Sequence, residues 1–472
     1  MKKKYNLFKS ILVCFFVFVV LSWIIPVSTI TEGALTTTTI KPVGIFGLIY
    51  YPIVTMTTFI QFAIIALVLG GFYGVLNKTG AYGKLVDKIV KNNKGKEKLF
   101  LILTITGFLV ISSVLGIQYG ILVFVPFVMA ILLKMGFNKI TSLSATIGAM
   151  LAGSIASTYG YNIGTQISQL LKTDINSNIT FKIAFLVIVL FLYMLFITGN
   201  SESTLTKKIK KDELKKVPFL DDEITTKKQT KPLTMLFVVL GLLLFLGMTN
   251  WKYMFNIDIF EKFHESIATI KINDFSIFSA IINISNPIGY WSSNELVVIL
   301  LIFSGLIGWI YGLKVDEIIE GFITGCKKMG KTSFLMTFGS IIFALMLVGG
   351  DSSMFVTIAD KLAHITERFN FFFTSIIALL SGFFYNDFYY ALNAANSTIK
   401  SISGDSFLLV SGFIFQTMHS IMMMIMPTSL ILLAGLSILN ISFKEWIKYI
   451  YKFIVQMIII SLVVSVILVL IA

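Results

Sequence analysis

Charge is the first thing that this sequence has little of. Only 13% of its 472 residues are charged, whereas a soluble domain is about 25% charged. Arginine is nearly absent, because Arg368 is the only one. Cysteine occurs twice, at Cys14 and Cys326, and both lie in or beside apolar segments, so no disulfide framework is implied. These shortages exclude an ordinary soluble domain.

The common catalytic signatures are missing too. There is no H-E-x-x-H and no G-x-S-x-G, so an intramembrane hydrolase is unsupported. The stretch "GCKKMGKT", Gly325 to Thr332, does fit the phosphate-binding pattern G-x-x-x-x-G-K-[ST]. We expect it in a short Lys-rich loop between apolar helices, with no strand before it, and therefore interpret it as a chance match. We expect no enzyme activity, no cofactor and no metal site.

Long apolar runs are what the chain has instead. They are near or at the length that crosses about 30 Å of hydrocarbon: Leu7–Val27, Phe59–Leu76, Ala184–Ile197, Leu233–Met248, Leu296–Ile310, Phe334–Val348 and Ile454–Ile471. We predict helices over 47–76, 180–198, 233–249, 296–313 and 333–350. The chain is therefore an all-α polytopic membrane protein, and the lipid bilayer is its first partner.

Lysine gives the orientation. The net charge of +14 comes from lysines that flank apolar runs, which indicates membrane-flanking charge and not a nucleic-acid partner. Lys2, Lys3 and Lys4 place the N-terminus in the cytoplasm, and no A-x-A-like cleavage site follows, so we expect a retained first helix. We expect a multi-pass protein of a bacterial plasma membrane.

Polar residues interrupt the apolar pattern twice in each half. In the first half we predict a re-entrant hairpin over 99–134, with its tip near Ser112–Gln118, and a broken helix over 140–171. Two ordinary short helices with an external turn remain an alternative for 99–134. In the second half we predict a hairpin over 371–400, with Asn386 and Asp387 near its tip. We also predict a broken helix over 406–440, interrupted around "QTMHSIMMMIMPTS" (416–429), where Pro427 removes a backbone donor.

The two halves repeat one plan. We assign 1–198 to the first half, 199–232 to a Lys-rich cytoplasmic linker, and 233–472 to a linking helix plus the second half. Since the helix 233–249 adds one crossing, the second copy starts from the opposite side of the membrane. Such inverted repeats are typical of secondary transporters, which bind a small solute near the midplane. A surface helix is also expected around "IFEKFHESI".

Three stretches resemble the anaerobic C4-dicarboxylate carrier family of the ion-transporter superfamily, which also includes arginine/ornithine antiporters: "LGGFYGVLNKTGA", Tyr311–Met329 and Phe413–Ile450. The resemblance implies a homodimer in which a transport domain moves against a scaffold as an elevator. It carries the family's Gln and Pro-Thr-Ser onto Gln416 and Pro427, Thr428 and Ser429. The chain departs from the family at Gln118-Tyr119, at Tyr385-Asn386-Asp387 and at His419, where a solute would bind.

The predicted binding residues are polar and aromatic and come from both hairpin tips and both helix breaks: Ser112, Ser113, Gln118, Tyr119, Ser157, Thr158, Asn162, Tyr385, Asn386, Asp387, Asn393, Gln416, His419, Pro427, Thr428 and Ser429. Candidates for coupling to H⁺, Na⁺ or a counter-substrate are Asp387, His419 and Asp351. Each of the three also has a non-functional alternative: Asp387 lies on the external surface in contact with water, His419 is a hydrogen-bonded core residue, and Asp351 is a solvated helix cap.

The predicted binding residues include no Lys or Arg, and this absence bears on which solute is bound. A dicarboxylate is best bound by cations or clustered N–H donors, whereas Asp387 would pair with an ammonium or a guanidinium. We therefore favour an amino acid, with arginine/ornithine as an example, over the alternative of a C4-dicarboxylate. A channel or a non-transporting scaffold is the alternative of another class. A transporter requires that Gln118, Asn162, Asp387 and Gln416 converge on one pocket.

Overall fold

A computed structural model describes residues 6–31, 34–37, 39–205, 218–220, 229–272, 275–282, 286–348, 352–366 and 368–471. Eight helical segments of this part are long and apolar enough to cross a membrane: Ile60–Lys78, Glu97–Leu115, Ile179–Asn200, Lys231–Met248, Ser293–Ile310, Val315–Leu347, Phe388–Met423 and Phe443–Ile471. Strand structure in the described residues is limited to two small hairpins. The predicted all-helical membrane protein is confirmed. Most of the predicted linker 199–232 lies outside the described residues.

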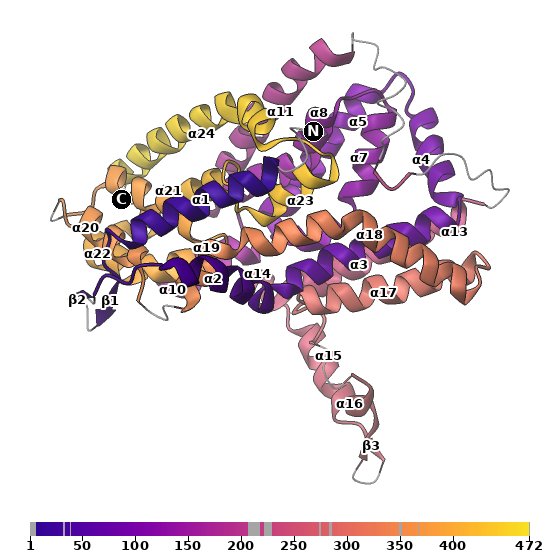
Figure 1. Ribbon diagram of the computed structural model, residues 1–472, viewed down its shortest axis with the longest axis horizontal. Coiled ribbons are helices and arrows are strands. Elements are labelled where there is room, and N and C mark those ends of the chain that lie inside the picture. Colours follow the sequence, from indigo (N-terminus) through magenta and orange to yellow (C-terminus); the bar gives the residue numbers. More distant parts are fainter. Residues whose placement is uncertain are drawn as a thin grey trace.

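The N-terminal region runs along one side of the molecule (Figure 1). Its elements are α1 (Asn6–Ser22), β1 (Ser28–Thr31), β2 (Ala34–Thr37), α2 (Ile45–Thr58) and α3 (Ile60–Lys78). The single helix predicted over 47–76 is wrong, because the chain kinks at Phe59 between α2 and α3. Several threonines precede the kink, and the Thr55 hydroxyl donates back to Tyr51 O at 2.8 Å. Such side-chain bonds compete with the helix backbone.

Two long helices cross at a contact made of glycines. These are α3 and α18 (Val315–Gly339), which α19 (Ile341–Val348) continues. A Cβ on Gly74 would lie 2.1 Å from Gly321 O, and one on Gly325 would lie 2.0 Å from Gly70 O. Only glycine allows this approach of the two backbones. The stretch "GCKKMGKT" lies within α18, so the loop that the sequence predicted there is wrong.

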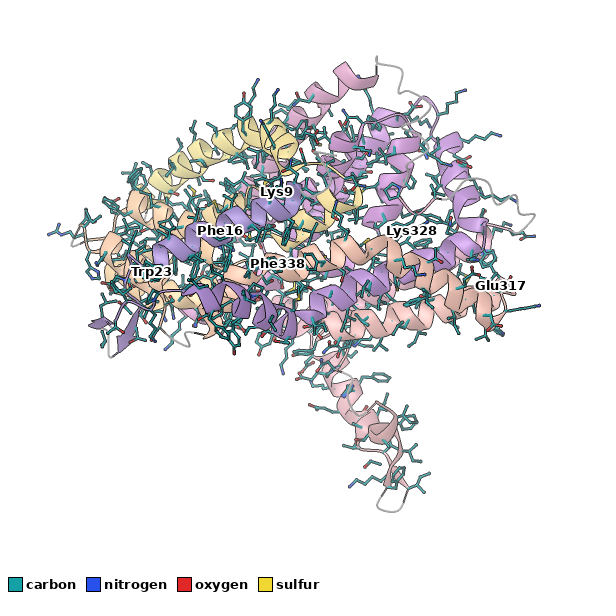
Figure 2. The ribbon with its side chains drawn as sticks, in the orientation of Figure 1. Lys9, Phe16, Trp23, Glu317, Lys328 and Phe338 are labelled. Atoms are coloured by element: carbon teal, nitrogen blue, oxygen red, sulfur yellow. The ribbon has the colours of Figure 1, made fainter. Side chains whose placement is uncertain are left out.

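Figure 2 shows Phe338 of α18 near α1, with Lys328 and Glu317 farther along the same helix. The ring of Phe338 lies 5.1 Å from that of Phe8 on α1, centroid to centroid. The end of α18 that carries Phe338 is thus packed in the body of the molecule, whereas the Glu317 end is more exposed.

The first hairpin and broken helix have many short elements. They are α4 (Ala81–Asn92), α5 (Glu97–Leu115), α6 (Gln118–Leu122), α7 (Val125–Lys134), α8 (Lys139–Leu143), η1 (Ser144–Gly148), α9 (Ala149–Ile155), η2 (Tyr161–Thr165), α10 (Gln166–Leu171) and α11 (Ile179–Leu205). The chain turns at Gly116, within the range predicted for the tip, and α5 packs along α9. The helix breaks over 156–160, inside the predicted interruption.

The second half has fewer and longer elements. They are α20 (Met354–Ala363), α21 (Phe371–Phe384), α22 (Phe388–Met423), α23 (Leu430–Ile438) and α24 (Phe443–Ile471). The hairpin tip is Tyr385–Asp387, as predicted. The predicted interruption around 416–429 is too long, because residues 416–423 remain helical and the break covers 424–429. The hairpin and the broken helix share α22, which changes direction at Gly404.

Between the halves, α13 (Lys231–Met248) and α17 (Ser293–Ile310) hold an arm that projects from the body (Figure 1). The helix α14 (Trp251–Phe255) packs against the body, and the arm consists of α15 (Ile259–Ala268), β3 (Lys271–Ile272), β4 (Phe275–Ser276) and α16 (Ile277–Ile282). The helix expected around "IFEKFHESI" is α15, and Ile259 and Phe263 on it are exposed.

Candidate functional site

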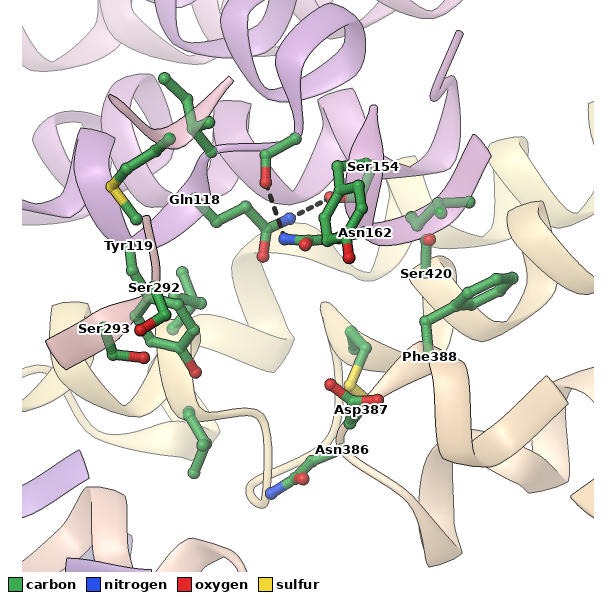
Figure 3. A pocket seen from close by; sticks show the side chains of 18 of the residues that line it. Gln118, Tyr119, Ser154, Asn162, Ser292, Ser293, Asn386, Asp387, Phe388 and Ser420 are labelled. Atoms are coloured by element: carbon green, nitrogen blue, oxygen red, sulfur yellow. Dashed lines mark hydrogen bonds between the residues drawn. The ribbon is translucent and has the colours of Figure 1, made fainter. Parts of the chain in front are cut away.

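A cavity of about 400 Å³ lies where the hairpin tips and the helix breaks come together. We call it the central cavity. Its lining includes Gly116–Tyr119 from the first tip, Tyr161–Ile163 after the first break, Asn386–Phe388 from the second tip, and Ser429–Ile431 after the second break. Residues far apart in the sequence thus form one cavity with both polar and apolar walls (Figure 3).

The first tip is a neutral glycine turn. Gly116 has a φ of +69°, and a Cβ there would lie 2.9 Å from Tyr161 N. Its carbonyl accepts a hydrogen bond from Asn162 Nδ2 at 2.7 Å. The Gln118 amide donates to the Ser154 hydroxyl. The two side-chain amides are thereby held at the edge of the cavity.

The second tip carries the acid. Asp387 has an extended backbone and caps α22, its Oδ1 accepting from Tyr389 N at 3.0 Å and Tyr390 N at 3.3 Å. Asn386 Nδ2 donates to Ser340 Oγ at 3.1 Å and to Thr428 O at 3.5 Å, which ties the tip to the second break. Figure 3 shows Asp387 across the cavity from Gln118 and Asn162. Asp387 supplies the only full charge among the described lining residues.

His419 lies on α22 at the wall of the cavity. Its Nδ1 is 2.9 Å from Ser381 Oγ, and its ring packs against Phe388 and Phe415, with centroids 5.4 and 6.4 Å away. Only 2% of its surface is exposed. The imidazole therefore contacts both the aromatic core and the cavity edge. This position is compatible with a binding or coupling role and also with a structural role in the core.

A third wall comes from residues that the sequence analysis missed. Between α13 and α17, the turn Gly289–Ser293 lines the cavity together with Asn250. Gly289 N and Trp291 N both donate to Gly247 O at 2.9 Å, and a Cβ on Gly247 would lie 1.8 Å from the Trp291 ring. The sequence did carry one signal, the capping pattern Ser292-x-x-Glu295 that starts α17. Nothing local placed that helix start beside the hairpin tips.

Helix N-termini face this cavity from several sides. The helices α17, α22 and α23, and the segment formed by η2 and α10, all begin at lining residues. The first turn of a helix has N–H groups without an intrahelical partner and the positive end of the helix dipole. Ser292 and Asp387 already accept from such groups in α17 and α22, whereas no side chain caps the start of α23 or η2. The cavity thus combines a positive backbone potential with one carboxylate.

Four predicted residues lie behind the first tip and hold the break. Ser112 Oγ donates to Met150 O at 2.7 Å, and Ser113 Oγ donates to Ala156 O at 2.5 Å. The Thr158 N–H and hydroxyl donate to Ser113 O at 3.0 and 3.3 Å. The Ser157 hydroxyl reaches the same oxygen at 3.5 Å. These residues shape the central cavity without lining it.

The remaining predicted residues are scattered. Tyr385 and Asn393 line a second cavity of about 460 Å³ on α19, α20 and α22. Gln416 lines a cavity behind the first break, although its Nε2 donates to Ile155 O and Ser157 O at 3.2 and 2.9 Å. Pro427 and Thr428 belong to the second break and do not line the central cavity. Asp351 lies outside the described residues. Of the four residues required to converge, Gln118, Asn162 and Asp387 do so and Gln416 does not.

Comparison with known proteins gives one match over the whole chain. The family model for the C4-dicarboxylate anaerobic carrier matches residues 5–471. Two solved structures are similar at lower identity. The YdaH transporter of Alcanivorax borkumensis is 15% identical over 96% of each chain, with a TM-score of 0.35. MtrF of Neisseria gonorrhoeae, from a class of antimetabolite efflux pumps, is 14% identical over 96% of this chain and 94% of its own, with a TM-score of 0.39.

No curated protein sequence matches the chain. With nearly all of its residues matched, the chain belongs to the C4-dicarboxylate anaerobic carrier family and is a membrane carrier, not an enzyme.

Proposed function

We propose that the chain is a secondary transporter that binds a C4-dicarboxylate in the central cavity and carries it across the plasma membrane. The family supports this solute over the amino acid that we favoured from the sequence. The observation that carries the proposal is the start of α23 at the cavity, where no side chain caps the helix, together with the start of the segment formed by η2 and α10. Free backbone N–H groups bind carboxylates without needing Lys or Arg.

The cavity has donors on two sides for two carboxylates. The amides of Gln118 and Asn162 lie on one side, and the start of α23 at Ser429 and Leu430 lies on another. Side-chain and backbone N–H groups in a site with little water bind an anion more strongly than they would in bulk water.

Asp387 is the residue that a simple anion site does not explain. A dianion beside an ionised carboxylate is unfavourable, so we infer that Asp387 binds H⁺ or Na⁺ while the solute is bound. This would couple the solute to an ion gradient. Asp387 also supports a second candidate, an amino acid whose ammonium group pairs with this carboxylate while its carboxylate faces the helix N-termini.

For the transport step we infer inverted repeats that work as an elevator. The support is a pair of corresponding contacts: Ser112 with Met150 in the first half and Ser381 with His419 in the second, each 38 residues apart. In each half the hairpin tip begins four residues after that serine, at Gly116 and Tyr385. Residues 1–198 and 233–472 are the proposed halves, and a homodimer is the proposed assembly.

Counterflow in vesicles tests the solute. The purified protein is reconstituted into separate batches of vesicles, each loaded with unlabelled succinate, aspartate, arginine or ornithine, and uptake of the same compound in labelled form is measured. We expect succinate to exchange and arginine and ornithine to fail. Exchange of arginine or ornithine without succinate would overturn the dicarboxylate. Aspartate, which has two carboxylates and an ammonium group, tests whether Asp387 accepts a cationic substituent. Repeating the assay with an imposed H⁺ or Na⁺ gradient identifies the coupling ion.

A further inference from the structure

A separate cavity of about 330 Å³ lies behind the first helix break, and we call it the rear cavity. Its walls come from α10, the turn Thr173–Asn178, α11, α22 and α24. None of its lining residues lines the central cavity. It is therefore a second space, with its own chemistry.

Most polar residues of the rear cavity lie in the turn Thr173–Asn178 and at Lys182, and its helical walls are mainly apolar apart from Ser168, Ser406 and Gln416. Lys182 Nζ donates to Ile175 O at 3.2 Å, which uses one of the three N–H groups of an ammonium. Thr173 and Ser177, in the turn that precedes α11, also line the cavity. Away from the turn, the apolar wall is formed by side chains of three helices: Phe181, Leu409, Val410, Phe413, Leu468 and Ile471. This division suits a molecule with a polar head and a hydrocarbon chain.

The position of the cavity indicates where such a molecule comes from. The cavity lies where α11 begins and α24 ends, and both helices are candidate membrane spans. Lys182 is in the first turn of α11, so it is expected at the level of the lipid headgroups. Leu409 and Ile471, two residues of the apolar wall, are 36% and 76% exposed. The apolar wall therefore reaches the exposed surface of two candidate membrane spans, α22 and α24.

We propose that the rear cavity binds an acyl-chain amphiphile whose anionic head, a phosphate or a carboxylate, is held by Lys182. Asp174 also lines the cavity and limits the charge of the head. Its Oδ1 accepts from Asn176 N at 3.0 Å and so closes the local turn. With one cation and one anion at the polar end, a singly charged head fits better than a dianion. A phosphodiester and a fatty-acid carboxylate both have that charge.

The bound amphiphile would lie next to a residue that shapes the central cavity. Gln416 lines the rear cavity, and its amide donates to Ile155 O and Ser157 O at the first break. A molecule packed against this side of α22 would restrict the Gln416 side chain and thereby the carbonyls of the break. The proposed site is thus placed to act on the solute site without touching the solute.

The experiment is a lipid titration in the absence of solute. Full-length protein in a mild detergent is stripped of lipid and titrated with phosphatidylglycerol, and bound lipid is counted by native mass spectrometry. A parallel titration uses oleate. The key variant is Lys182→Gln. The matched control is Lys172→Gln, which removes the same charge from an exposed residue at the same end of the molecule and outside the rear cavity.

We expect wild type and Lys172→Gln to bind one phosphatidylglycerol alike, and Lys182→Gln to bind it on the order of tenfold more weakly or worse, since a charge-assisted bond is lost. Leu409→Trp, which fills the apolar wall and keeps Lys182, should also lose the lipid. Equal binding by both lysine variants, or no bound lipid in wild type, would overturn the proposal. If oleate displaces the phospholipid, the carboxylate is an accepted head; if it does not, the phosphodiester is required. Because no solute is present, these outcomes do not depend on the proposed transport function.

Discussion

The two hairpin tips both line the central cavity but are built differently. The first tip turns at Gly116 with a positive φ and presents the neutral amide of Gln118. The second tip has extended residues at Tyr385 and Asp387 and presents a carboxylate that caps its own helix. The two tips therefore supply different chemistry to one cavity.

The difference separates geometry from charge. At the first tip a tight backbone turn does the work, and its side chains are held by neutral hydrogen bonds. At the second tip the backbone needs no glycine, and the side chain carries an ionisable group that caps its own helix. If this comparison is right, changes to the first tip should damage folding or shape, and changes to the second should damage coupling.

The largest effect is expected from Gly116→Ala. A positive φ costs a non-glycine residue about 1–2 kcal/mol, and the new Cβ would lie 2.9 Å from Tyr161 N, which adds an overpacking cost of about 1–3 kcal/mol. We expect a clear fall in the thermal unfolding midpoint in detergent, or loss of the folded protein on size exclusion. Gly107→Ala on α5 is the control, because a Cβ there meets nothing within 4 Å. Equal stability of the two variants would remove the special role of the first turn.

The next effect is expected from Asp387→Asn, and it should leave folding intact. Asparagine caps a helix as well as aspartate does, so the unfolding midpoint should stay near that of wild type. Ion-driven uptake in vesicles should fall by roughly 5–150-fold, the usual range of a coupling free energy. Asp405→Asn, on an exposed residue of the same helix, should transport normally. Wild-type uptake by Asp387→Asn under an ion gradient would exclude this carboxylate from coupling.

How far the sequence predicted this arrangement depends on how local each signal was. The tips were found because Gly116 and the Asn-Asp pair at 386–387 are turn and cap residues. The length of the second break was wrong, because Pro427 disturbs only the turn before it and cannot unwind residues 416–423. Gly325 was wrongly predicted to lie in a loop. It lies in a helix, and a glycine is needed there because the backbone contacts Gly70, which is far away in the sequence.

The site residues were predicted less well than the tips, for a related reason. Asn393 follows Asp387 closely in the sequence, but the helix turns its side chain to another cavity. Ser112 and Ser113 are near the first tip, yet their hydroxyls donate hydrogen bonds to the broken helix behind the tip and not into the cavity. The turn Gly289–Ser293 joins the site only through tertiary packing against Gly247. Periodicity and capping predict where a helix stops, and they do not predict which cavity a side chain enters.

The two helix breaks extend the comparison with a smaller effect. Gln416 Nε2 donates two of the hydrogen bonds that hold the first break, and Trp446 Nε1 donates one to Met424 O of the second break at 2.8 Å. We expect Gln416→Leu to leave two carbonyls unsatisfied and to weaken solute binding by about tenfold. Trp446→Phe loses a single bond and should weaken binding less. Equilibrium dialysis measures the solute affinity of both variants. A larger loss of affinity in Trp446→Phe than in Gln416→Leu would contradict the expectation that the first break depends more on its side-chain hydrogen bonds.

The smallest effect is expected at the neutral side chain of the first tip. Gln118→Ala removes one neutral hydrogen bond to Ser154 at the cavity edge, and such a bond contributes about 0.5–1.5 kcal/mol net. Solute affinity should therefore fall by a few-fold, whereas the response to an ion gradient should not change, because no charge has been removed. Gln456→Ala, on an exposed position of α24, provides the control for loss of a glutamine side chain. A loss of ion coupling in Gln118→Ala would mean that the two tips share the ion, and the division between a shaping tip and a charged tip would have to be abandoned.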